Sequence, residues 1–576
     1  MAGGFQIEIE RQVGSEFSAR SGAMRPPTFA YAGVRLWSDE PMIQIDPQTI
    51  IIGHLFSRGP PSRRIVSLSP GEGQRLAADK ARLLLDGYWG GYLMVRIDEA
   101  GAVRILRDPS GALPCYFLCE ADRITLAGDI ADLASPAPGQ VDFEEIARVI
   151  ASGDARGRRT CLRGIDELIA GECIVIDRSH VSIEPWWTPW DHVDPPLEME
   201  VADAAVRLRE TITDCVGTWA SCFSSILLGA SGGLDSSIVA AAAAPRADRL
   251  TCLTLFGPDF DGDERRYAAA LADSLGLDLR EASREIGDID ITRAAGPHHP
   301  WPVVPLGAQT NEAIHRRLQK ELSIDAYFTG NGGDGVLCSI RSAVPFLDRF
   351  LAEGPRLALS DTLRDICVLT GADKMTVLRH AWSRYRRAGG RHVVQYNASG
   401  LCAEFVARIE ASGATHPWLA APDDVLPGKT VHAAYLMRTQ QGVELYPRAV
   451  SPPHIAPLLS QPIVELCLSI PTWMWISGGL NRAVARKAFE GRLPAIITRR
   501  TQKGGPGGFD LAIYRRNRAA LLEHLRGGLL VDAGIVDTTL LDEPEDRSWR
   551  GTERIQHILA LGAAESWARW WSAPRI

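Results

Sequence analysis

The sequence predicts an α/β protein in which a strand-rich amino-terminal part precedes a parallel-sheet domain with a helical carboxyl-terminal part. Residues 1–190 hold short apolar runs separated by Gly, Pro and Asp, which is typical of strands bounded by turns. From residue 201 helical patterns alternate with strand patterns, as in the βαβ units of a parallel sheet. Beyond residue 340 the periodicity is mostly helical. We therefore expect two domains, at residues 1–195 and 201–576.

Length and composition limit the class of protein. A chain of 576 residues with 45% hydrophobic and 23% charged residues can bury large cores and form two to four domains. The net charge of −8 offers no basic field for nucleic acid. The 11 cysteines show no repeated short spacing, which favours buried thiols in a reducing compartment. We find no signal-peptide pattern and no apolar run of transmembrane length, so we expect a cytoplasmic enzyme without a membrane partner.

The elements expected in the first part are strands, and the break after them is a linker. Strand-like runs lie at residues 92–97, 103–106, 116–118, 124–127 and 173–176. The Pro- and acid-rich residues 186–200 are typical of a linker. Apolar residues at positions 205, 208, 212, 216 and 219 then have helical spacing.

The most informative segment is a glycine turn between a strand and a helix. The apolar residues 226–228 lead into Ser231-Gly232-Gly233-Leu234-Asp235-Ser236-Ser237, and an Ala-rich helix at 238–244 follows. Glycine lets the backbone turn tightly, so that successive N–H groups and the helix N-terminus face one anion. Asp235 is then placed to hold Mg²⁺ between phosphate oxygens. This is the pattern of a pyrophosphate loop in enzymes that cleave ATP to AMP and pyrophosphate; the alternative is a plain Gly/Ser turn.

A second strand and glycine turn repeats the pattern. A strand at 250–256 and a helix at 266–275 follow the first loop, and residues 325–335 then form another apolar strand that enters a glycine turn with Asp334. Asp334 is a possible second ligand of Mg²⁺, although an acid on such a turn can also be a simple turn residue. Asp263 and Glu264 precede the helix at 266, and the helix dipole explains them.

Two basic segments invite different interpretations. Arg499, Arg500 and Lys503 adjoin the glycines at 504 and 505, where Lys503 could stabilise charge on the α-phosphate and the leaving pyrophosphate; a solvated basic turn is the alternative. Residues 427–430 read Pro-Gly-Lys-Thr and suggest a Walker-type ATPase. Asp423 stands where that pattern requires glycine, so we regard this segment as a decoy.

Taken together, these segments resemble the asparagine synthetase B family across nearly the whole chain. Weaker similarities follow in the family's order at residues 107–117, 160–173, 298–306 and 457–471. The resemblance implies a class II glutaminase-like β-sandwich domain followed by an ATP-pyrophosphatase domain, with ATP and Mg²⁺ bound. It implies Lys503 and Asp235 as catalytic residues and Asp235 and Asp334 as metal ligands. The ATP-binding residues that it implies are Leu228, Ser231, Gly232, Gly233, Asp235, Ser236, Leu255 and Gly330.

Departures from the family pattern narrow the expected function. The glutaminase reaction needs a cysteine after the initiator methionine, and Ala2 stands there, so we expect an inactive glutaminase-like domain. The second loop has Asn331 and Gly335 where asparagine synthetases carry glutamates, which argues against ammonia as the acceptor. Two branches with similar losses close rings instead, the lasso peptide cyclases and the β-lactam synthetases. β-Lactam synthetases have a tyrosine near the place of Asn331, so the second loop is most like that of the cyclases.

The resemblance therefore implies an AMP-forming ligase that adenylates an Asp or Glu side chain of a precursor peptide. The peptide's N-terminal amine would then close an isopeptide macrolactam. A leader peptidase and a leader-recognition protein are the partners that such a cyclase implies. A β-lactam synthetase-like amide-forming enzyme is the alternative, and a catalytically inactive scaffold is the non-enzymatic one. Trp301, Trp473 and Trp475 could line a peptide cavity or pack in the core.

Overall fold

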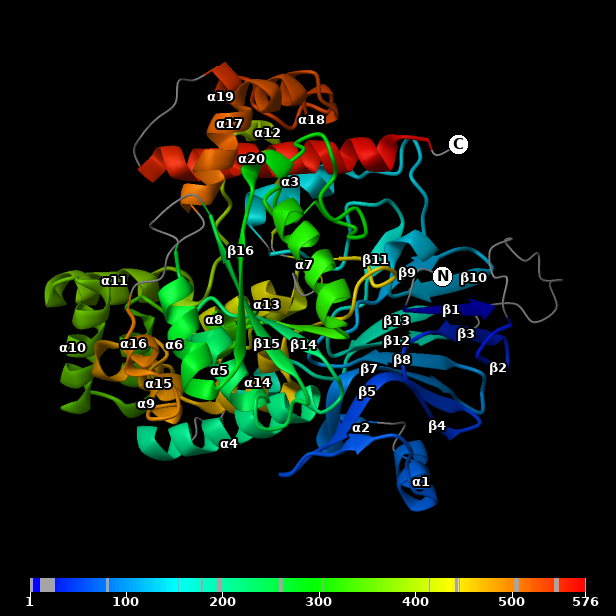
Figure 1. The fold of residues 1–576 in the computed structure, drawn as a ribbon, viewed down its shortest axis with the longest axis horizontal. Helices are drawn as coiled ribbons and strands as arrows, with labels where there is room; N and C mark the ends of the chain where they lie inside the picture. The colour runs from blue at the N-terminus through cyan, green and yellow to red at the C-terminus, as the bar shows by residue number, and fades with distance from the viewer. Residues whose placement is uncertain are drawn as a thin grey trace.

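The computed structural model describes residues 4–10, 26–78, 82–153, 155–177, 180–193, 199–257, 263–302, 304–413, 415–440, 444, 446–501, 507–542 and 549–574. It is a mixed α/β protein. Two antiparallel sheets form the amino-terminal part, a parallel sheet lies at the centre, and helices make up most of the remainder (Figure 1). The predicted fold class is confirmed.

The two antiparallel sheets pack face to face. The first has the order β11 (Ile165–Glu167), β9 (Tyr116–Cys119), β10 (Arg123–Ala127), β1 (Phe5–Glu10), β3 (Val34–Ser38) and β2 (Phe29–Tyr31). The second has the order β13 (Val181–Pro185), β12 (Glu172–Ile176), β8 (Val103–Arg107), β7 (Tyr88–Ile97), β5 (Thr49–Ser57) and β4 (Met42–Asp46), and β6 (Arg64–Ile65) pairs with β5. Side chains of β1 alternate between buried and half-buried, and Ile7 joins Ile52 and Leu93 of the second sheet in one apolar core.

The central sheet is parallel, with the order β16 (Asp278–Ser283), β15 (Leu250–Phe256), β14 (Ile226–Gly229), β17 (Ala326–Phe328) and β18 (His454–Ile455). Strand β14 is a continuous apolar run and β15 is mostly apolar, with Thr251 and Thr254 also buried, because both faces of a parallel sheet are covered. The strands that the sequence predicted at 92–97, 103–106, 116–118, 124–127, 173–176, 226–228 and 250–256 all lie within observed strands.

The helices follow the predicted rhythm. They are α1 (Pro70–Ala78), α2 (Leu83–Gly87), α3 (Phe143–Ser152), α4 (Val201–Ala220), α5 (Leu234–Ala243), α6 (Arg265–Leu275), α7 (Ala308–Leu322), α8 (Gly333–Val336), α9 (Val344–Glu353), α10 (Ala358–Thr370), α11 (Lys374–Arg386), α12 (Ala403–Ser412), α13 (Pro427–Gln440), α14 (Gln461–Ser469), α15 (Ala483–Ala488), α16 (Ala495–Thr498), α17 (Gly507–Arg526), α18 (Leu529–Asp532), α19 (Thr539–Asp542) and α20 (Trp549–Ser572). Among the described residues, no helix is both long and apolar enough to cross a membrane.

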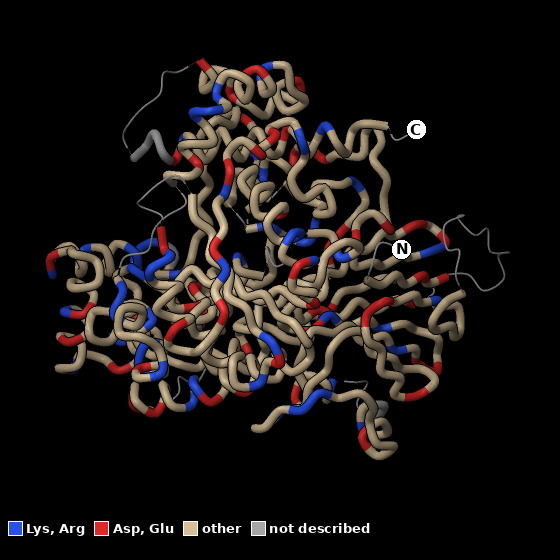
Figure 2. The backbone as a smooth tube through the Cα atoms, in the orientation of Figure 1, with Lys and Arg blue, Asp and Glu red and all other residues tan. Residues whose placement is uncertain are grey.

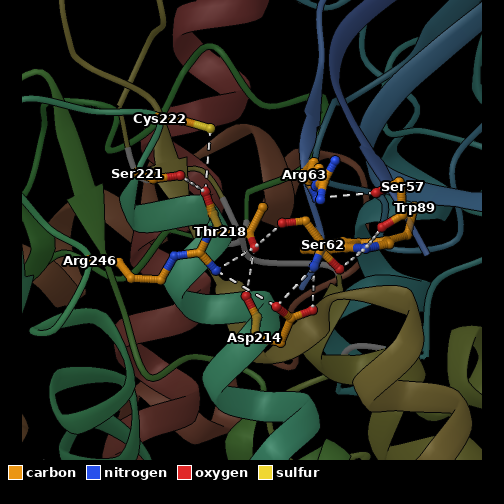
Figure 3. A network of polar contacts seen from close by, with 9 residues as sticks. All are labelled: Ser57, Ser62, Arg63, Trp89, Asp214, Thr218, Ser221, Cys222 and Arg246. Atoms are coloured by element: carbon orange, nitrogen blue, oxygen red, sulfur yellow. Dashed lines mark hydrogen bonds and ion pairs between the residues drawn. The ribbon is translucent and has the colours of Figure 1, made fainter. Parts of the chain in front are cut away.

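Contacts between the two parts of the chain are extensive. Helix α4 precedes the central strand β14, and its Asp214 accepts hydrogen bonds from the backbone N–H of Ser62 at 3.0 and 3.1 Å (Figure 3). The ring N–H of Trp89 donates to the hydroxyl of the same Ser62 at 3.2 Å. Helix α3 packs against α12 and α20. The amino-terminal sandwich is therefore fixed to the helices that surround the central sheet.

The predicted linker differs from expectation. Residues 189–192 form a short 3₁₀ helix, and Trp187 is buried, with its ring 5.6 Å from that of Trp418. The Trp187 ring N–H also donates to Glu465 at 3.0 Å. An indole ring can bury a large apolar area, and this burial outweighs the extended character of the flanking prolines.

Acidic and basic residues are interspersed along both parts of the chain (Figure 2).

Candidate active site

The first glycine turn lies at the carboxyl end of β14, between β15 and β17. Gly232 has a φ of +63°, the left-handed region that glycine adopts without a steric cost. A Cβ on Gly232 would lie 2.2 Å from the Cβ of Tyr267, so the turn also needs glycine for its close approach to α6. Helix α5 begins at Leu234, earlier than the sequence predicted, and Asp235 therefore lies in its first turn. Backbone N–H groups at this helix start can bind an anion.

Hydroxyl groups order the turn. Ser237 donates to the carbonyl of Gly233 at 2.8 Å, Ser236 donates to the same carbonyl at 3.3 Å, and the Gly233 N–H donates to the Ser231 hydroxyl at 3.3 Å. Leu228 is buried in β14, and Leu255 is half-buried near the end of the neighbouring strand β15. The residues predicted to bind ATP therefore cluster at one edge of the central sheet.

The second glycine turn packs directly on the first. It follows β17, the strand beside β14. A Cβ on Gly330 would lie 2.5 Å from the backbone nitrogen of Ser236, and a Cβ on Gly333 would lie 2.4 Å from the Cγ of Asp235. Both distances are shorter than any real Cβ contact. These two glycines therefore allow the two turns to meet.

An arginine that the sequence did not single out joins the two aspartates. The Nη1 atom of Arg482 lies 2.8 and 2.7 Å from the two carboxylate oxygens of Asp235 and 2.8 Å from Oδ1 of Asp334. The side chains of Arg482 and Asp235 are each 10% exposed, whereas that of Asp334 is 61% exposed. Arg482 precedes α15 in the left-handed conformation, with φ +55°. Charge-assisted bonds to two carboxylates offset the cost of this conformation.

The predicted metal ligands, Asp235 and Asp334, can be compared with the oxygen donors that Mg²⁺ prefers. Among the residues that the structure describes, no three His, Cys, Asp or Glu side chains form a metal cluster. Asp235 and Asp334 nevertheless direct carboxylate oxygens at one cationic atom, Nη1 of Arg482. Mg²⁺ prefers oxygen donors and is commonly bound by one or two carboxylates together with substrate phosphates. The two aspartates fit this donor set, with the guanidinium now at the position a cation would take.

A second arginine holds the first turn against α6. Arg500 donates to Glu264 at 2.6 Å and to the carbonyl of Gly232 at 3.4 Å, and its guanidinium lies 3.9 Å from the ring centre of Tyr267. The side chains of Arg500 and Glu264 are 11% and 14% exposed. The helix dipole is therefore not the whole explanation of Glu264, because Glu264 forms a largely buried ion pair with Arg500.

Other predicted positions have different fates. Lys503 lies outside the described residues, as does Ala2. Arg499 is exposed. Trp475 and Trp301 are buried, and the guanidinium of Arg156 lies 4.3 Å from the Trp301 ring, so both tryptophans pack in the interior.

The Walker-like segment is structural. Lys429 is buried in the first turn of α13 and donates to the carbonyls of Leu468 and Ile470. Burial lowers the pKa of its ammonium group to about 8. The hydroxyl of Thr430 donates to Pro427 within the same turn of helix. Neither side chain is available to a nucleotide, so this part of the sequence is a decoy, as predicted.

Arg482 carries no signal in the sequence that would mark it as a site residue. Its neighbours read Gly-Gly-Leu-Asn-Arg, a segment with no distinctive spacing. Arg486, one turn later, donates to the carbonyls of Asn481 and Thr498 at 2.7 Å each and fixes the segment. Burial, together with the charge of Arg482, lowers the pKa of Arg486 to about 10. Only the tertiary fold brings this cationic pair to the glycine turns.

Comparison with curated proteins and solved structures finds distant similarity. No curated protein matches the chain. Two solved structures share 10% identity at a TM-score of 0.17. One is described as the allosteric regulatory enzyme of purine biosynthesis, with 43% of this chain and 62% of that chain covered. The other is the glutamine phosphoribosylpyrophosphate amidotransferase from B. subtilis, with 62% and 80% covered. The chain thus spans less than two thirds of the first of these structures.

Residues 207–569 match the family described as asparagine synthase. The matched range contains both glycine turns, Asp235, Asp334, Arg482 and Arg500. Enzymes of this family are ATP-dependent ligases that form carbon–nitrogen bonds. Because the match covers well over half of its length, the chain belongs to the asparagine synthase family.

Proposed function

We propose that the chain is an ATP-dependent lasso peptide cyclase, an AMP-forming macrolactam synthetase. Its substrate is a precursor peptide in which an Asp or Glu side chain is adenylated and the N-terminal amine closes an isopeptide ring. The observation that carries the proposal is the contact between the two glycine turns, where Arg482 joins Asp235 to Asp334. This site is suited to bind and cleave ATP. The second turn has Asn331 and Gly335 in place of the glutamates that would handle ammonia.

The packing around Gly335 supports an acceptor other than ammonia. A Cβ on Gly335 would lie 2.8 Å from the carbonyl oxygen of Tyr435 and 2.7 Å from a side-chain carbon of Thr439. Helix α13 therefore fills the space that a glutamate side chain would need at this position. Asn331, the other departure, is exposed and has no ionisable group. Neither position offers a carboxylate to bind ammonium or to take a proton from it.

The thiols of the amino-terminal sandwich also support a substrate-borne amine. Glutamine hydrolysis requires a thiolate. Cys115, Cys161 and Cys173 are buried, and burial raises the pKa of each thiol, to about 12 for Cys115 and Cys173. Cys119 lies at the exposed end of β9. The three buried thiols are therefore poorly suited to supply the thiolate that glutamine hydrolysis needs.

The first chemical step is adenylation. The peptide carboxylate attacks the α-phosphorus of ATP, a carboxylate P–O bond forms, and the bond to the β-phosphate oxygen breaks to release pyrophosphate. Backbone N–H groups at the start of α5 would face the phosphates, and Arg482 and Arg500 would supply positive charge beside them. Mg²⁺ held by Asp235 and Asp334 would neutralise phosphate charge when bound.

The second step forms the ring. The peptide's N-terminal amine attacks the acyl carbon, the C–O bond to AMP breaks, and the amine loses a proton to solvent. Amine and acyl group belong to one peptide, so a bound conformation that holds them together supplies much of the rate. We expect Lys503 to stabilise charge in these steps. A leader peptidase and a leader-recognition protein remain the proposed partners.

Mass spectrometry of linear peptides tests this proposal. The purified protein is incubated with ATP, Mg²⁺ and peptides that carry one acidic residue at different distances from the amino terminus. We expect peptide-dependent AMP and a product that has lost one water and resists aminopeptidase. Asp235→Asn should abolish both, whereas Asp263→Asn should leave them intact, because Asp263 pairs with Arg265 outside the glycine turns.

Other products would redirect the assignment. AMP formed only with small amino acid derivatives would favour the β-lactam synthetase-like alternative. A dehydrated peptide that aminopeptidase still degrades would show that the N-terminal amine is not the acceptor. Both results would contradict the cyclase proposal, although they would leave an AMP-forming ligase in place.

A further inference from the structure

Exposed apolar side chains are concentrated in one helical lobe. Most of the large hydrophobic side chains that the described residues expose lie between positions 350 and 393, within and beside α9, α10 and α11. These helices form the lobe at the left of Figure 1, on the far side of the molecule from the sandwich. Large apolar side chains that are exposed side by side mark interaction sites.

On α11 these side chains form a stripe. Met375, Trp382 and Tyr385 are 65%, 63% and 43% exposed, and Leu378 lies between them, half-buried. Their spacing of three, four and three residues places them on one face of the helix. The opposite face of α11 holds the buried Val377, which packs with Ile366 and Ile476. The stripe therefore faces away from the lobe's own core.

The chain segment that carries the stripe is cationic. Residues 374–403 contain no Asp or Glu and six Lys or Arg, in a chain whose net charge is −8. Arg379 follows Met375 by four residues, and Arg386 follows Trp382 by four residues, so both border the stripe. Both arginines are exposed, and Arg379 donates to the hydroxyl of Thr376 at 3.2 Å. The apolar row and its basic border together define what can bind here.

We propose that this outer face of α11 docks an acidic amphipathic helix of a protein or peptide partner. The face comprises Met375, Leu378, Trp382 and Tyr385, bordered by Arg379 and Arg386. A narrow apolar stripe of this kind matches the seam between two packed helices. A helix that lies on a membrane would present a broader apolar face. Acidic side chains beside the partner's apolar row would pair with the two arginines.

The position of α11 connects this surface to the ligase site. Helix α10 packs on the 3₁₀ segment Thr472–Gly479, and α15, which follows Arg482, packs on the same segment. A partner on α11 would therefore be held on the lobe that adjoins the glycine turns. Binding of a partner at this face does not depend on the ring-closing reaction.

Fluorescence anisotropy with synthetic peptides tests the surface. The probe is a labelled peptide with Leu at helical spacing and Glu elsewhere. Two control peptides keep its length: one places the same Leu and Glu residues at alternating, strand-like positions, and one carries Lys in place of Glu. We expect the full chain to bind only the acidic helical peptide, with a Kd on the order of 10–100 µM. Arg379→Glu with Arg386→Glu, or Trp382→Ala with Tyr385→Ala, should weaken binding at least about tenfold.

A matched charge reversal on α7 separates specific docking from net charge. Arg317 and Lys320 are exposed and stand three residues apart on that helix, so reversing both changes the net charge equally and should leave peptide binding unchanged. Equal binding of the strand-patterned peptide, or equal loss in the α7 variant, would overturn the proposal. Sedimentation with phosphatidylglycerol vesicles that depends on Trp382, without peptide binding, would identify a membrane instead.

Nucleotide binding distinguishes failure of this inference from failure of the proposed function. The double variant Arg379→Glu with Arg386→Glu should bind ATP with Mg²⁺ as the parent chain does, because neither residue contacts the glycine turns. A loss of peptide binding with intact nucleotide binding supports the docking face. Absence of peptide binding in the parent chain would reject the docking face and leave the ligase proposal untouched.

Discussion

Adding one methyl group at Gly333 should separate the two glycine turns. An alanine Cβ there would lie 2.4 Å from the Cγ and 2.5 Å from the Cβ of Asp235, about 1 Å short of ordinary contact at 3.4 Å. The φ of Gly333 lies outside the left-handed region, so the substitution is strained by crowding and not by backbone conformation. Asp235 is held on its other side by Arg482 and cannot simply rotate away without losing those contacts.

The size of the effect follows from this crowding. Overpacking a filled interior typically costs about 1–3 kcal/mol. If that cost falls on the arrangement that binds nucleotide, the Kd for ATP with Mg²⁺ should rise by about 5- to 150-fold. Isothermal titration calorimetry measures this without a peptide substrate, and thermal unfolding shows whether the fold is retained.

Gly229→Ala is the matched control. Gly229 ends β14 just before the first turn, a Cβ there would meet nothing within 4 Å, and its φ is also outside the left-handed region. We expect this variant to bind nucleotide as the parent does. Normal nucleotide binding by Gly333→Ala, or equal impairment in both variants, would refute the argument that contact between the two turns forms the site.

Three further predictions concern charge. Arg482→Met leaves the two aspartates without their shared cation, so the free energy of unfolding without Mg²⁺ should fall by about 3–5 kcal/mol. Urea titrations should show that adding Mg²⁺ restores part of this free energy. Arg482→Lys keeps a positive charge and should lower the free energy of unfolding by less. Arg500→Ala removes the ion pair to Glu264 and the hydrogen bond to the Gly232 carbonyl, so the KM for ATP should rise in an AMP-release assay. The melting temperature should also fall, because Glu264 is left largely buried and unpaired. An unchanged KM would count against a role of Arg500 in ordering the turn. Burial lowers the pKa of His299 and His315 to about 4 and that of His454 to about 3, below the unfolded value of 6.5. Between pH 6.5 and pH 4 the unfolded chain therefore binds more protons than the folded chain, and the free energy of unfolding should fall as the pH falls. Urea midpoints measured at pH 7.5 and at pH 5 test this prediction.

Much of the fold was predictable because the strands carry their own signal. Buried parallel strands such as β14 and β15 are mostly apolar, and the sequence predicts their ends to within a residue or two. The start of α5 was placed too late because its first turn contains the Ser and Asp residues of the glycine turn. The sequence predicts a linker at residues 186–200 because prolines and acids dominate there. Trp187 is nevertheless buried, and its burial depends on Trp418, a residue more than 200 positions away.

The site was predicted only where local sequence encodes it. The two turns have strand–glycine–acid patterns, and their contact follows from two neighbouring parallel strands. Arg482 and the partner of Glu264 were not predictable, because each contact joins segments more than 140 residues apart. A single sequence gives no measure of such a pairing. The stripe on α11 shows the same limit, since helical spacing alone cannot tell an exposed apolar row from a buried one.

We propose that the site between the two glycine turns cleaves ATP between the α- and β-phosphates. ³¹P NMR of the reaction with ATP, Mg²⁺ and the acid-containing peptides identifies the phosphorus products directly. We predict AMP and pyrophosphate in equal amounts, formed only with peptide and lost in Asp235→Asn. Formation of ADP and inorganic phosphate would contradict the claim, because the β–γ bond would then be the one that breaks.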